Sequence, residues 1–368
     1  MGNSFGKLLQ IMTFGESHGP GVGVVIDGIP GNMPINLDDV QQELFRRRPG
    51  QSKLTSPRQE ADRLICLSGI EDGRSLGGPI TIYVENGDKR SNDYKDIQQV
   101  FRPGHADFTM LKKYGITAKS GGGRASARET VGRVAAGAIA LQVIRQIIPD
   151  LDIVAWVQSV KDVCATSIPE SSVSRQEVDQ SDVRCPDPNA AQLMTELINK
   201  VKANGDSVGG VIRCVMRGVP PGLGEPVFDK LEADLAKAMM SLPATKGFEV
   251  GSGFKSTLML GSEHNDPLQV QEGKICSTSN HAGGINGGIS NGEIITINIA
   301  FKPVSTIFRP QQTVDRRGNN ITFTPESGRH DPCVLPRAVP MVEAMAALVI
   351  ADHVLRWRAT GAFIKPSF

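Results

Sequence analysis

Short runs of β-branched residues alternate along this chain with longer stretches of helical spacing. In residues 294–301, Ile295, Ile297, Ile299 and Phe301 alternate with smaller or polar residues. A period of two predicts a strand with one buried face. Four more runs of this composition are predicted to be strands: 22–26, 80–84, 153–157 and 211–215.

Helical spacing predicts five helices. They cover residues 37–47, 128–147, 191–203, 231–240 and 342–357. Asn36 is the expected N-cap of the first helix. Two capping boxes are predicted, Ser126 with Glu129 before the second helix and Asp229 with Glu232 at the fourth.

The order of these elements predicts an α+β fold in which sheets cover a helical layer. Residues 128–147 and 342–357 are rich in Ala, so they are expected to pack closely at the centre of that layer. We expect one domain over residues 1–368. The polar segment 173–188 is the expected exposed insertion.

Composition narrows the functional classes. The 368 residues are 39% hydrophobic and 21% charged, as in ordinary globular proteins. Lys and Arg number 40 against 39 Asp and Glu, and this balance argues against a nucleic-acid-binding protein. The six Cys residues form no CxxC pair, which disfavours a zinc site and is typical of reduced thiols in a cytoplasmic protein. The N-terminal residues lack the apolar core of a signal peptide, and the apolar run 134–144 is too short to span a membrane.

Candidate chemistry lies in glycine-rich loops rather than in a standard nucleotide signature. The loops are GESHGPG at 15–21, RRRPG at 46–50, FRPGHAD at 101–107, GGGRASARET at 121–130, NHAGGINGGISNG at 280–292 and GRHDPC at 328–333. His18 and His105 each lie in such a loop, either as hydrogen-bonded turn residues or as acids and bases. Arg124 and Arg128 follow a glycine run at a helix start, which favours anion binding. Together these loops indicate a substrate with several negative charges.

These segments resemble the chorismate synthase family. GESHGPGVG, RPGHAD, GGGRASARET, SNHAGGINGGISNG and GRHDPCVLPRAVPMVEAM look like the family's signatures, in its order, and the likeness covers nearly the whole chain. The resemblance implies a lyase that converts 5-enolpyruvylshikimate 3-phosphate into chorismate by 1,4-anti elimination of phosphate, the last step of the shikimate pathway. It also implies dependence on reduced FMN without net redox change, and a homotetramer whose subunits are β-α-β sandwiches.

The same resemblance implies roles for individual residues. His18 would protonate the departing phosphate, His105 would protonate or stabilise the reduced flavin, and Asp331 would help to remove a proton from flavin N5. The substrate anions would be held by Ser17, Arg47, Lys53, Arg102, Ser126, Arg128 and Arg329. The flavin would lie against Arg124, Ala125, Ser126, Pro243, Ala244, Gly287, Lys302, Pro303, Val304, Ser305, Thr306 and Arg329. No metal is expected.

Three positions depart from the usual family residues. Lys53 stands where many members carry Arg, which removes a bidentate contact, and Ala125 and Val304 lack the common hydroxyl groups.

Because no extra flavin-reductase segment is evident, we expect a separate reductase rather than NADPH oxidation by this chain. Two other functions compete, a flavin-independent phosphohydrolase using Ser17, His18 and Asp331, and a module that binds RNA or phosphoproteins through its Arg clusters. Near-neutral charge and 5% aromatic residues count against the second.

Overall fold

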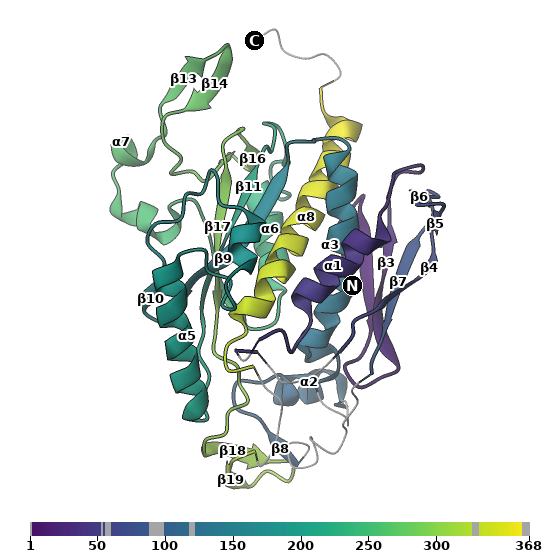
Figure 1. Cartoon of the computed structure of the whole chain (residues 1–368), viewed down its shortest axis with the longest axis vertical. Helices are drawn as coiled ribbons and strands as arrows, with labels where there is room; N and C mark the ends of the chain where they lie inside the picture. The colour runs from purple at the N-terminus through teal and green to yellow at the C-terminus, as the bar shows by residue number, and fades with distance from the viewer. Residues whose placement is uncertain are drawn as a thin grey trace.

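Two five-stranded antiparallel sheets lie on either side of a layer of helices (Figure 1). The computed structural model describes residues 2–52, 54–55, 60–87, 99–117, 122–325 and 331–362. The first sheet has the order β1 (Ser4–Phe5), β2 (Gln10–Gly15), β3 (Gly21–Asp27), β7 (Ile80–Glu85) and β4 (Leu64–Ser68). The second has the order β10 (Val163–Cys164), β9 (Asp152–Val160), β11 (Gly210–Arg217), β17 (Ile295–Phe301) and β12 (Thr245–Val250). The predicted α+β arrangement is confirmed.

All five predicted strands are present, as β3, β7, β9, β11 and β17. In β17 the side chains of Ile295, Ile297 and Ile299 are fully buried, as the alternation predicted. The central strand β11 places Cys214 opposite Ala155 of β9 and Ile297 of β17, so the register brings three buried side chains to the helical layer.

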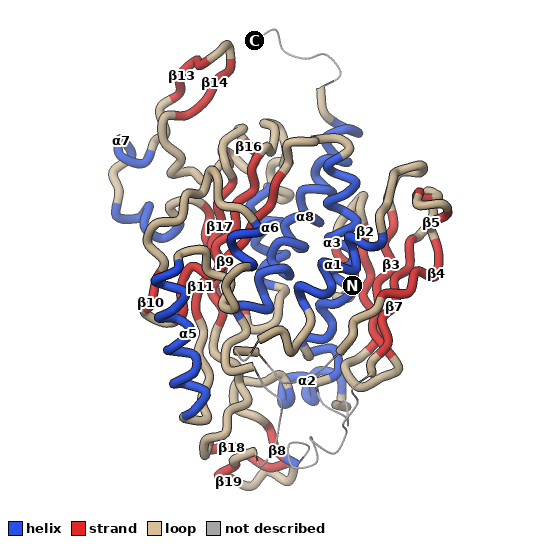
Figure 2. Tube along the Cα trace, in the orientation of Figure 1, coloured by secondary structure: helices blue, strands red, loops and turns tan. Residues whose placement is uncertain are grey.

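The helical layer is built around α3 (Thr130–Arg145) and α8 (Leu335–Thr360), with α1 (Leu37–Arg47) and α6 (Leu231–Met240) beside them (Figure 2). A Cβ atom on Gly137 of α3 would lie 2.5 Å from the Cα of Ala344 in α8. Only glycine permits this approach, and the Ala-rich faces around it make the close packing possible. By length and composition α8 could cross a membrane, but 94% of its most apolar window is buried inside the protein, as in a core helix.

Helix α8 begins seven residues earlier than predicted. The added part contains two prolines, which lack the N–H group that the interior of a helix uses. Pro336 lies at the beginning, where that N–H would have no partner. Pro340 leaves the carbonyl of Pro336 without its helical donor, and Arg184 Nη1 donates to that oxygen at 2.6 Å.

The segment 173–188 is not the exposed insertion that its polarity predicted. It contains α4 (Arg175–Asp179), and the side chains of Val173, Val178 and Val183 are buried. The segment packs against the core because its few apolar residues face inward. The following helix, α5 (Pro188–Ala203), starts three residues before the predicted position.

The predicted caps hold in part. Asn36 accepts from the backbone N–H of Asp38 at 2.9 Å and so caps α1, as predicted. The capping box predicted at Asp229 is wrong, since α6 follows Lys230 without a side-chain cap. Asp229 instead accepts from Arg356 at 3.1 Å, because a buried guanidinium is a stronger partner than a backbone amide.

The box predicted at Ser126 is half right. Ser126 Oγ accepts from the backbone N–H of Arg128 at 3.3 Å. Glu129 does not complete the box, because its carboxylate accepts from Thr13 and Arg133. A 3-10 turn, η4 (Ala127–Glu129), therefore comes before α3.

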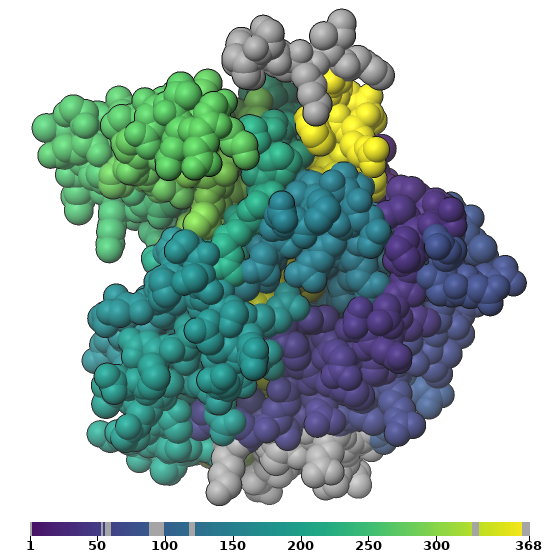
Figure 3. Space-filling model, turned by 45° about the horizontal axis from the view of Figure 1, so that its top comes forward, coloured from purple at the N-terminus to yellow at the C-terminus, as the bar shows by residue number. Residues whose placement is uncertain are grey.

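The remaining elements surround these layers. They are β5 (Ile70–Glu71), β6 (Arg74–Ser75), β8 (Val100–Phe101), α2 (Asp107–Tyr114), η3 (Gly123–Ala125), η5 (Gly253–Leu258), α7 (Gly261–His264), β13 (Leu268–Gln271), β14 (Lys274–Ser277), β15 (Ile285–Asn286), β16 (Ile289–Ser290), β18 (Gln311–Asp315) and β19 (Asn320–Phe323). The space-filling view shows the segment that carries β13 and β14 standing clear of the main body (Figure 3).

Candidate active site

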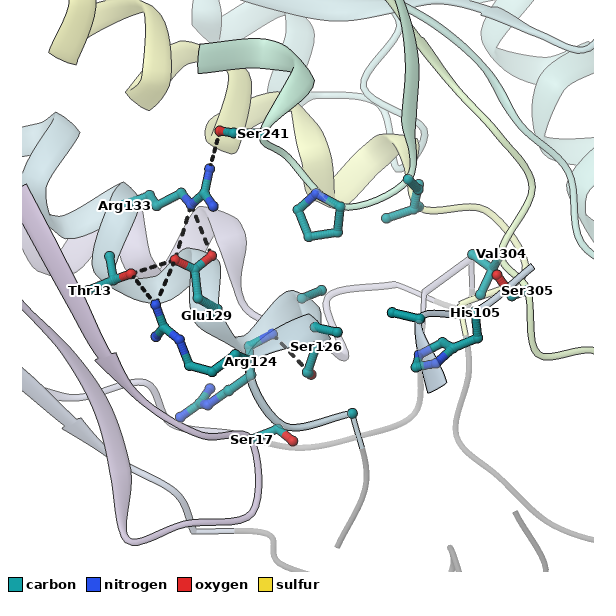
Figure 4. Close-up of a pocket in the computed structure, with 18 of the residues that line it drawn as sticks. Thr13, Ser17, His105, Arg124, Ser126, Glu129, Arg133, Ser241, Val304 and Ser305 are labelled. Atoms are coloured by element: carbon teal, nitrogen blue, oxygen red, sulfur yellow. Dashed lines mark hydrogen bonds and ion pairs between the residues drawn. The ribbon is translucent and has the colours of Figure 1, made fainter. Parts of the chain in front are cut away.

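A cavity of about 800 Å³ lies where the first sheet, the start of α3 and the turn after β17 meet (Figure 4). This volume is typical of a small-molecule site. Eight cationic side chains line it against three carboxylates. The cations are Arg47, Arg102, Arg124, Arg128, Arg133, Lys237, Lys302 and Arg337, and the carboxylates are Glu60, Glu129 and Asp331. The excess of positive charge is what an anionic ligand requires.

The cavity brings together most of the residues singled out from the sequence. Those that line it are Ser17, Arg47, Arg102, His105, Arg124, Ala125, Ser126, Arg128, Pro243, Ala244, Lys302, Val304, Ser305, Thr306 and Asp331. His18 and Pro303 are not lining residues, but each adjoins one in the chain. Gly287 does not line the cavity either, and lies in the turn between β15 and β16 with φ +61°. Lys53 and Arg329 lie outside the described residues.

The loop that carries Ser17 and His18 is held by a residue that the sequence did not single out. Asn86, directly after β7, donates through Nδ2 to the carbonyl oxygens of Glu16 at 2.8 Å and Gly19 at 2.9 Å. Ser17 is buried, and its Oγ lies 2.9 Å from His18 Nδ1. The loop thus presents a hydroxyl group to the cavity with an imidazole directly behind it.

Asp62 joins two of the cavity's arginines and was also missed. Its carboxylate accepts from Arg128 Nη1, and from Arg47 Nη1 at 3.3 Å. Arg128 Nε donates to Asn86 Oδ1 at 2.8 Å, so this pair is tied to the loop of Ser17. One carboxylate therefore orients two guanidinium groups, each of which is almost fully buried.

The surroundings of Arg47 disfavour its positive charge, because the side chain is fully buried and lies near another cation. Burial lowers its pKa to about 9, the positive charge of Arg337 adds to that shift, and the negative charge of Asp62 opposes it. At neutral pH the group stays protonated. A buried cation that faces another cation gains from a bound anion, which indicates that ligand charge is met here.

A second cluster surrounds His105 on the other side of the cavity. Asp107 accepts from Arg102 through two bonds of 2.7 and 2.8 Å, and its Oδ1 lies 2.7 Å from His105 Nδ1. The carboxylate contact requires a proton on Nδ1, which leaves Nε2 to face a ligand. Burial raises the pKa of Asp107, but hydrogen bonds from Arg102 and His105 outweigh burial and hold it well below its ordinary value.

The turn after β17 is fastened to the loop of His105. Lys302 Nζ donates to the carbonyl oxygen of Gly104 at 3.1 Å and to Ser305 Oγ at 2.7 Å. Ser305 Oγ donates to the same carbonyl at 2.7 Å. Burial lowers the pKa of Lys302, and the charge of Lys246 adds to the shift. This part of the cavity is thus one hydrogen-bonded unit.

A third cluster closes the opposite end (Figure 4). Glu129 accepts from Thr13 Oγ1 at 2.7 Å and from Arg133 Nε at 2.9 Å, while Arg133 Nη1 donates to Ser241 Oγ at 2.6 Å. Arg124 Nη2 donates to Thr13 Oγ1 at 2.7 Å. These bonds link β2 and α3 to the loop after α6, so the end of the cavity is rigid.

We expect Asp107→Asn to lower stability in a pH-dependent way. A carboxyl group whose pKa is depressed by folding stabilises the native state above its unfolded pKa, about 4, and loses that contribution as the pH falls further. The free energy of unfolding should therefore differ most between wild type and variant at pH 5–7, and the difference should shrink towards pH 3. Urea denaturation across this range measures it. A difference that does not change with pH would contradict the assignment.

A site of this size and charge, set between two antiparallel sheets, is that of an enzyme acting on a small polyanion. The family model of chorismate synthase matches residues 9–355. The chorismate synthase of Gloeothece citriformis (strain PCC 7424) is 59% identical over 97% of this chain and 98% of its own length. That of Opitutus terrae is 55% identical over 98% of each chain. A crystal structure of a chorismate synthase superimposes with a TM-score of 0.75 at 29% identity, over 95% of this chain and 93% of the other.

This chain therefore belongs to the chorismate synthase family, and it is a lyase of aromatic amino acid biosynthesis.

Proposed function

We propose that this chain converts 5-enolpyruvylshikimate 3-phosphate into chorismate and inorganic phosphate by 1,4-anti elimination, with reduced FMN bound. The C–O bond to phosphate breaks, a proton leaves C6 and a new double bond forms, so no electrons are gained or lost overall. The observation that supports this proposal best is the cavity, in which eight cationic side chains face three carboxylates. The substrate carries two carboxylates and a phosphate, and burying it requires that many partners.

His18 is the proposed acid. When Ser17 Oγ donates to His18 Nδ1, the neutral imidazole carries its proton on Nε2, from which it can pass to the departing phosphate. A positioned acid of this kind contributes about 10²–10⁴-fold to the rate. Phosphate leaves poorly unless its charge is neutralised, which is why this proton matters most for turnover.

The substrate anions are assigned to the arginines around Asp62 and to those beside His105. Arg47 and Arg128 are fixed by Asp62, and Arg102 is fixed by Asp107, so the donors are held before a ligand arrives. Fixed guanidinium groups bind carboxylate and phosphate oxygens with little loss of entropy. Lys53 and Arg329, with the hydroxyl groups of Ser17 and Ser126, complete the proposed set.

The lining residues fit FMN. Ala125, Pro243, Ala244 and Val304 give the cavity small apolar walls suited to a flat ring, while Lys302 and Ser305 offer polar groups at its edge. Arg124, Ser126, Gly287, Pro303 and Thr306, together with Arg329, are the other proposed contacts. When bound, reduced FMN supplies transient electron density to the substrate. With Nδ1 donating to Asp107, His105 would carry a second proton on Nε2 towards the ring as an imidazolium, and Asp331 would accept a proton.

Anaerobic turnover tests the proposal. Pure protein is assayed for chorismate with chemically reduced FMN, with oxidised FMN plus NADPH, and without flavin. Turnover with reduced FMN alone is expected, because we also propose that a separate reductase supplies the flavin. Phosphate release without flavin, and without chorismate, would instead favour the phosphohydrolase built on Ser17, His18 and Asp331.

We further propose a homotetramer. Two apolar faces stay exposed in the described residues: the outer face of the first sheet, with Met12, Phe14, Ile65 and Leu67, and the projecting arm, with Phe254, Leu258, Leu260, Leu268, Val270 and Ile275. Leu258 is 87% exposed, and a lone hairpin such as β13–β14 is only marginally stable in water. Two separate faces that each pair with their own copy generate a D2 tetramer.

Leu258→Asp combined with Leu268→Asp is therefore expected to give a dimer. Each charge would have to be buried in the interface, whereas the outer face of the first sheet would still pair. Light scattering after gel filtration measures the mass, and Lys255→Asp in the same arm is the control for added negative charge. Tetramers of the double variant would contradict the proposed role of the arm.

The remaining proposals concern the number of domains and the location of the protein in the cell. The core residues form one hydrophobic cluster that spans both sheets and the helical layer, which supports a single domain over residues 1–368. All six cysteines are unpaired thiols, which supports a reducing, cytoplasmic location.

A further inference from the structure

Arg337 lines the cavity from the first turns of α8, and although it lies in the signature segment 328–345 it was not among the expected site residues. Its Nη1 donates to Asp331 Oδ2. The residue is 8% exposed, and its Nε is buried without a partner within the described ranges. Buried guanidinium N–H groups almost always have an acceptor, so this one calls for an explanation.

Three guanidinium groups meet at this end of the cavity. Arg337 lies close enough to Arg47 for its charge to disfavour the protonated form of Arg47, and Arg128 acts on Arg47 in the same direction. Asp62 pairs with Arg47 and Arg128, Glu60 Oε2 lies 3.8 Å from Arg128 Nη2, and Asp331 pairs with Arg337. These carboxylates match the three cations in number, but within the described residues none of them accepts from the buried Nε of Arg337.

We propose that Arg337 is a further substrate-binding residue, whose Nε edge donates to an anionic oxygen of the substrate while Nη1 holds Asp331 in place. This inference rests on the proposed function. It explains why an arginine is placed here, because the three N–H donors of a lysine lie on one nitrogen, whereas the Nε and Nη1 of a guanidinium group donate from two atoms in fixed, different directions. It also accounts for the buried Nε–H of Arg337, which has no partner among the described residues.

A purely structural Arg337–Asp331 pair predicts something different. In that case substitution of Arg337 lowers stability and turnover, but leaves the affinity for the substrate as it was. The substrate-binding role predicts a selective loss of affinity for anions that survives when folding is intact. Binding must therefore be measured apart from activity.

The experiment compares Arg337→Gln and Arg337→Lys with wild type. Arg358→Gln is the matched control, since Arg358 lies on the same helix but is exposed. We expect KM for 5-enolpyruvylshikimate 3-phosphate to rise about 10²-fold in Arg337→Gln and about 10-fold in Arg337→Lys, from the loss of a charge-assisted bond. The dissociation constant of FMN should change less than about 2-fold, because the proposed flavin contacts lie elsewhere.

A second readout needs no turnover. Thermal stabilisation of the flavin-free protein is measured with shikimate 3-phosphate and with shikimate, which keeps the ring carboxylate but lacks the phosphate. Arg337→Gln should lose the stabilisation given by the probe that carries the contacted oxygen, which also tells phosphate from carboxylate. Arg337→Lys should retain part of it.

The outcomes separate the two proposals. If wild type forms no chorismate with reduced FMN, the proposed function fails. If wild type turns over and Arg337→Gln keeps both its KM and its stabilisation by the probes, only the role of Arg337 is overturned. If both variants fail to fold, circular dichroism shows it, and Arg337→Met, which keeps the volume of the side chain, is put through the same binding assay with the same criteria.

Discussion

Replacing His18 by Ala is expected to lower the turnover number by about 10²-fold or more, with FMN binding unchanged. The loss follows from the leaving group, because phosphate departs with a charge that only a positioned proton neutralises. Asn86 holds the loop independently of the imidazole, so the cavity should keep its shape. Steady-state kinetics under anaerobic conditions give the turnover number, and flavin fluorescence gives the affinity.

The controls for His18 come from the same chain. His264→Ala, in α7 on the projecting arm, tests for a general effect of losing a histidine. Ser17→Ala should lower the turnover number less than His18→Ala, because Ser17 orients the ring and contacts the substrate but does not supply the proton. Turnover of His18→Ala within about 2-fold of wild type would refute the assignment of the acid.

Arg128→Ala is expected to have the second largest effect. It should raise KM for the substrate by about 10²-fold or more, and lower the free energy of unfolding by about 3 kcal/mol. Both effects have one cause: the guanidinium group faces the cavity and also balances the buried carboxylate of Asp62. FMN affinity should fall far less. Kinetics, flavin titration and urea denaturation measure the three quantities.

Asp62→Asn separates the two parts of that effect. The substitution keeps the shape of the side chain but removes the charge that Arg128 and Arg47 share. It should destabilise the fold while both guanidinium groups remain in the cavity, so KM should change less than in Arg128→Ala. If Arg128→Ala lowered the affinity for FMN more than the affinity for the substrate, the assignment of Arg128 to the substrate would be contradicted.

Local patterns determined the elements well. The five strands and the exact span of α1 follow from spacing and caps that act within a few residues, such as Asn36 on Asp38. Patterns failed where a distant partner overrode the local preference. Asp229 accepts from Arg356 instead of capping α6, and Glu129 accepts from Arg133 and Thr13 instead of completing its capping box. Arg184 donates to the carbonyl oxygen of Pro336, for which Pro340 has no N–H group.

The site residues, like the helices and strands, were predictable where the signal was local and not where it depended on distant partners. Glycine-rich loops with His and Arg were visible in the sequence, since those residue types are needed wherever backbone and cations approach an anion. Asp62 and Asn86 gave no such signal, because a single Asp or Asn in an ordinary segment is not distinctive. Arg337 lies in the signature segment 328–345, but a single Arg within its apolar run did not stand out as a site residue. Their roles arise only from what they contact in space.

The sequence by itself thus determined five of the strands, five of the helices apart from some of their ends, the family and the loops that carry the chemistry, all of which depend on neighbouring residues. Only the tertiary structure decided how those loops meet, that one carboxylate at Asp62 serves two arginines, and that Arg337 keeps a buried donor without a partner in the described residues. The reason is physical: burial and charge coupling are set by residues far apart in the chain, and both become defined only when the two sheets close on the helical layer.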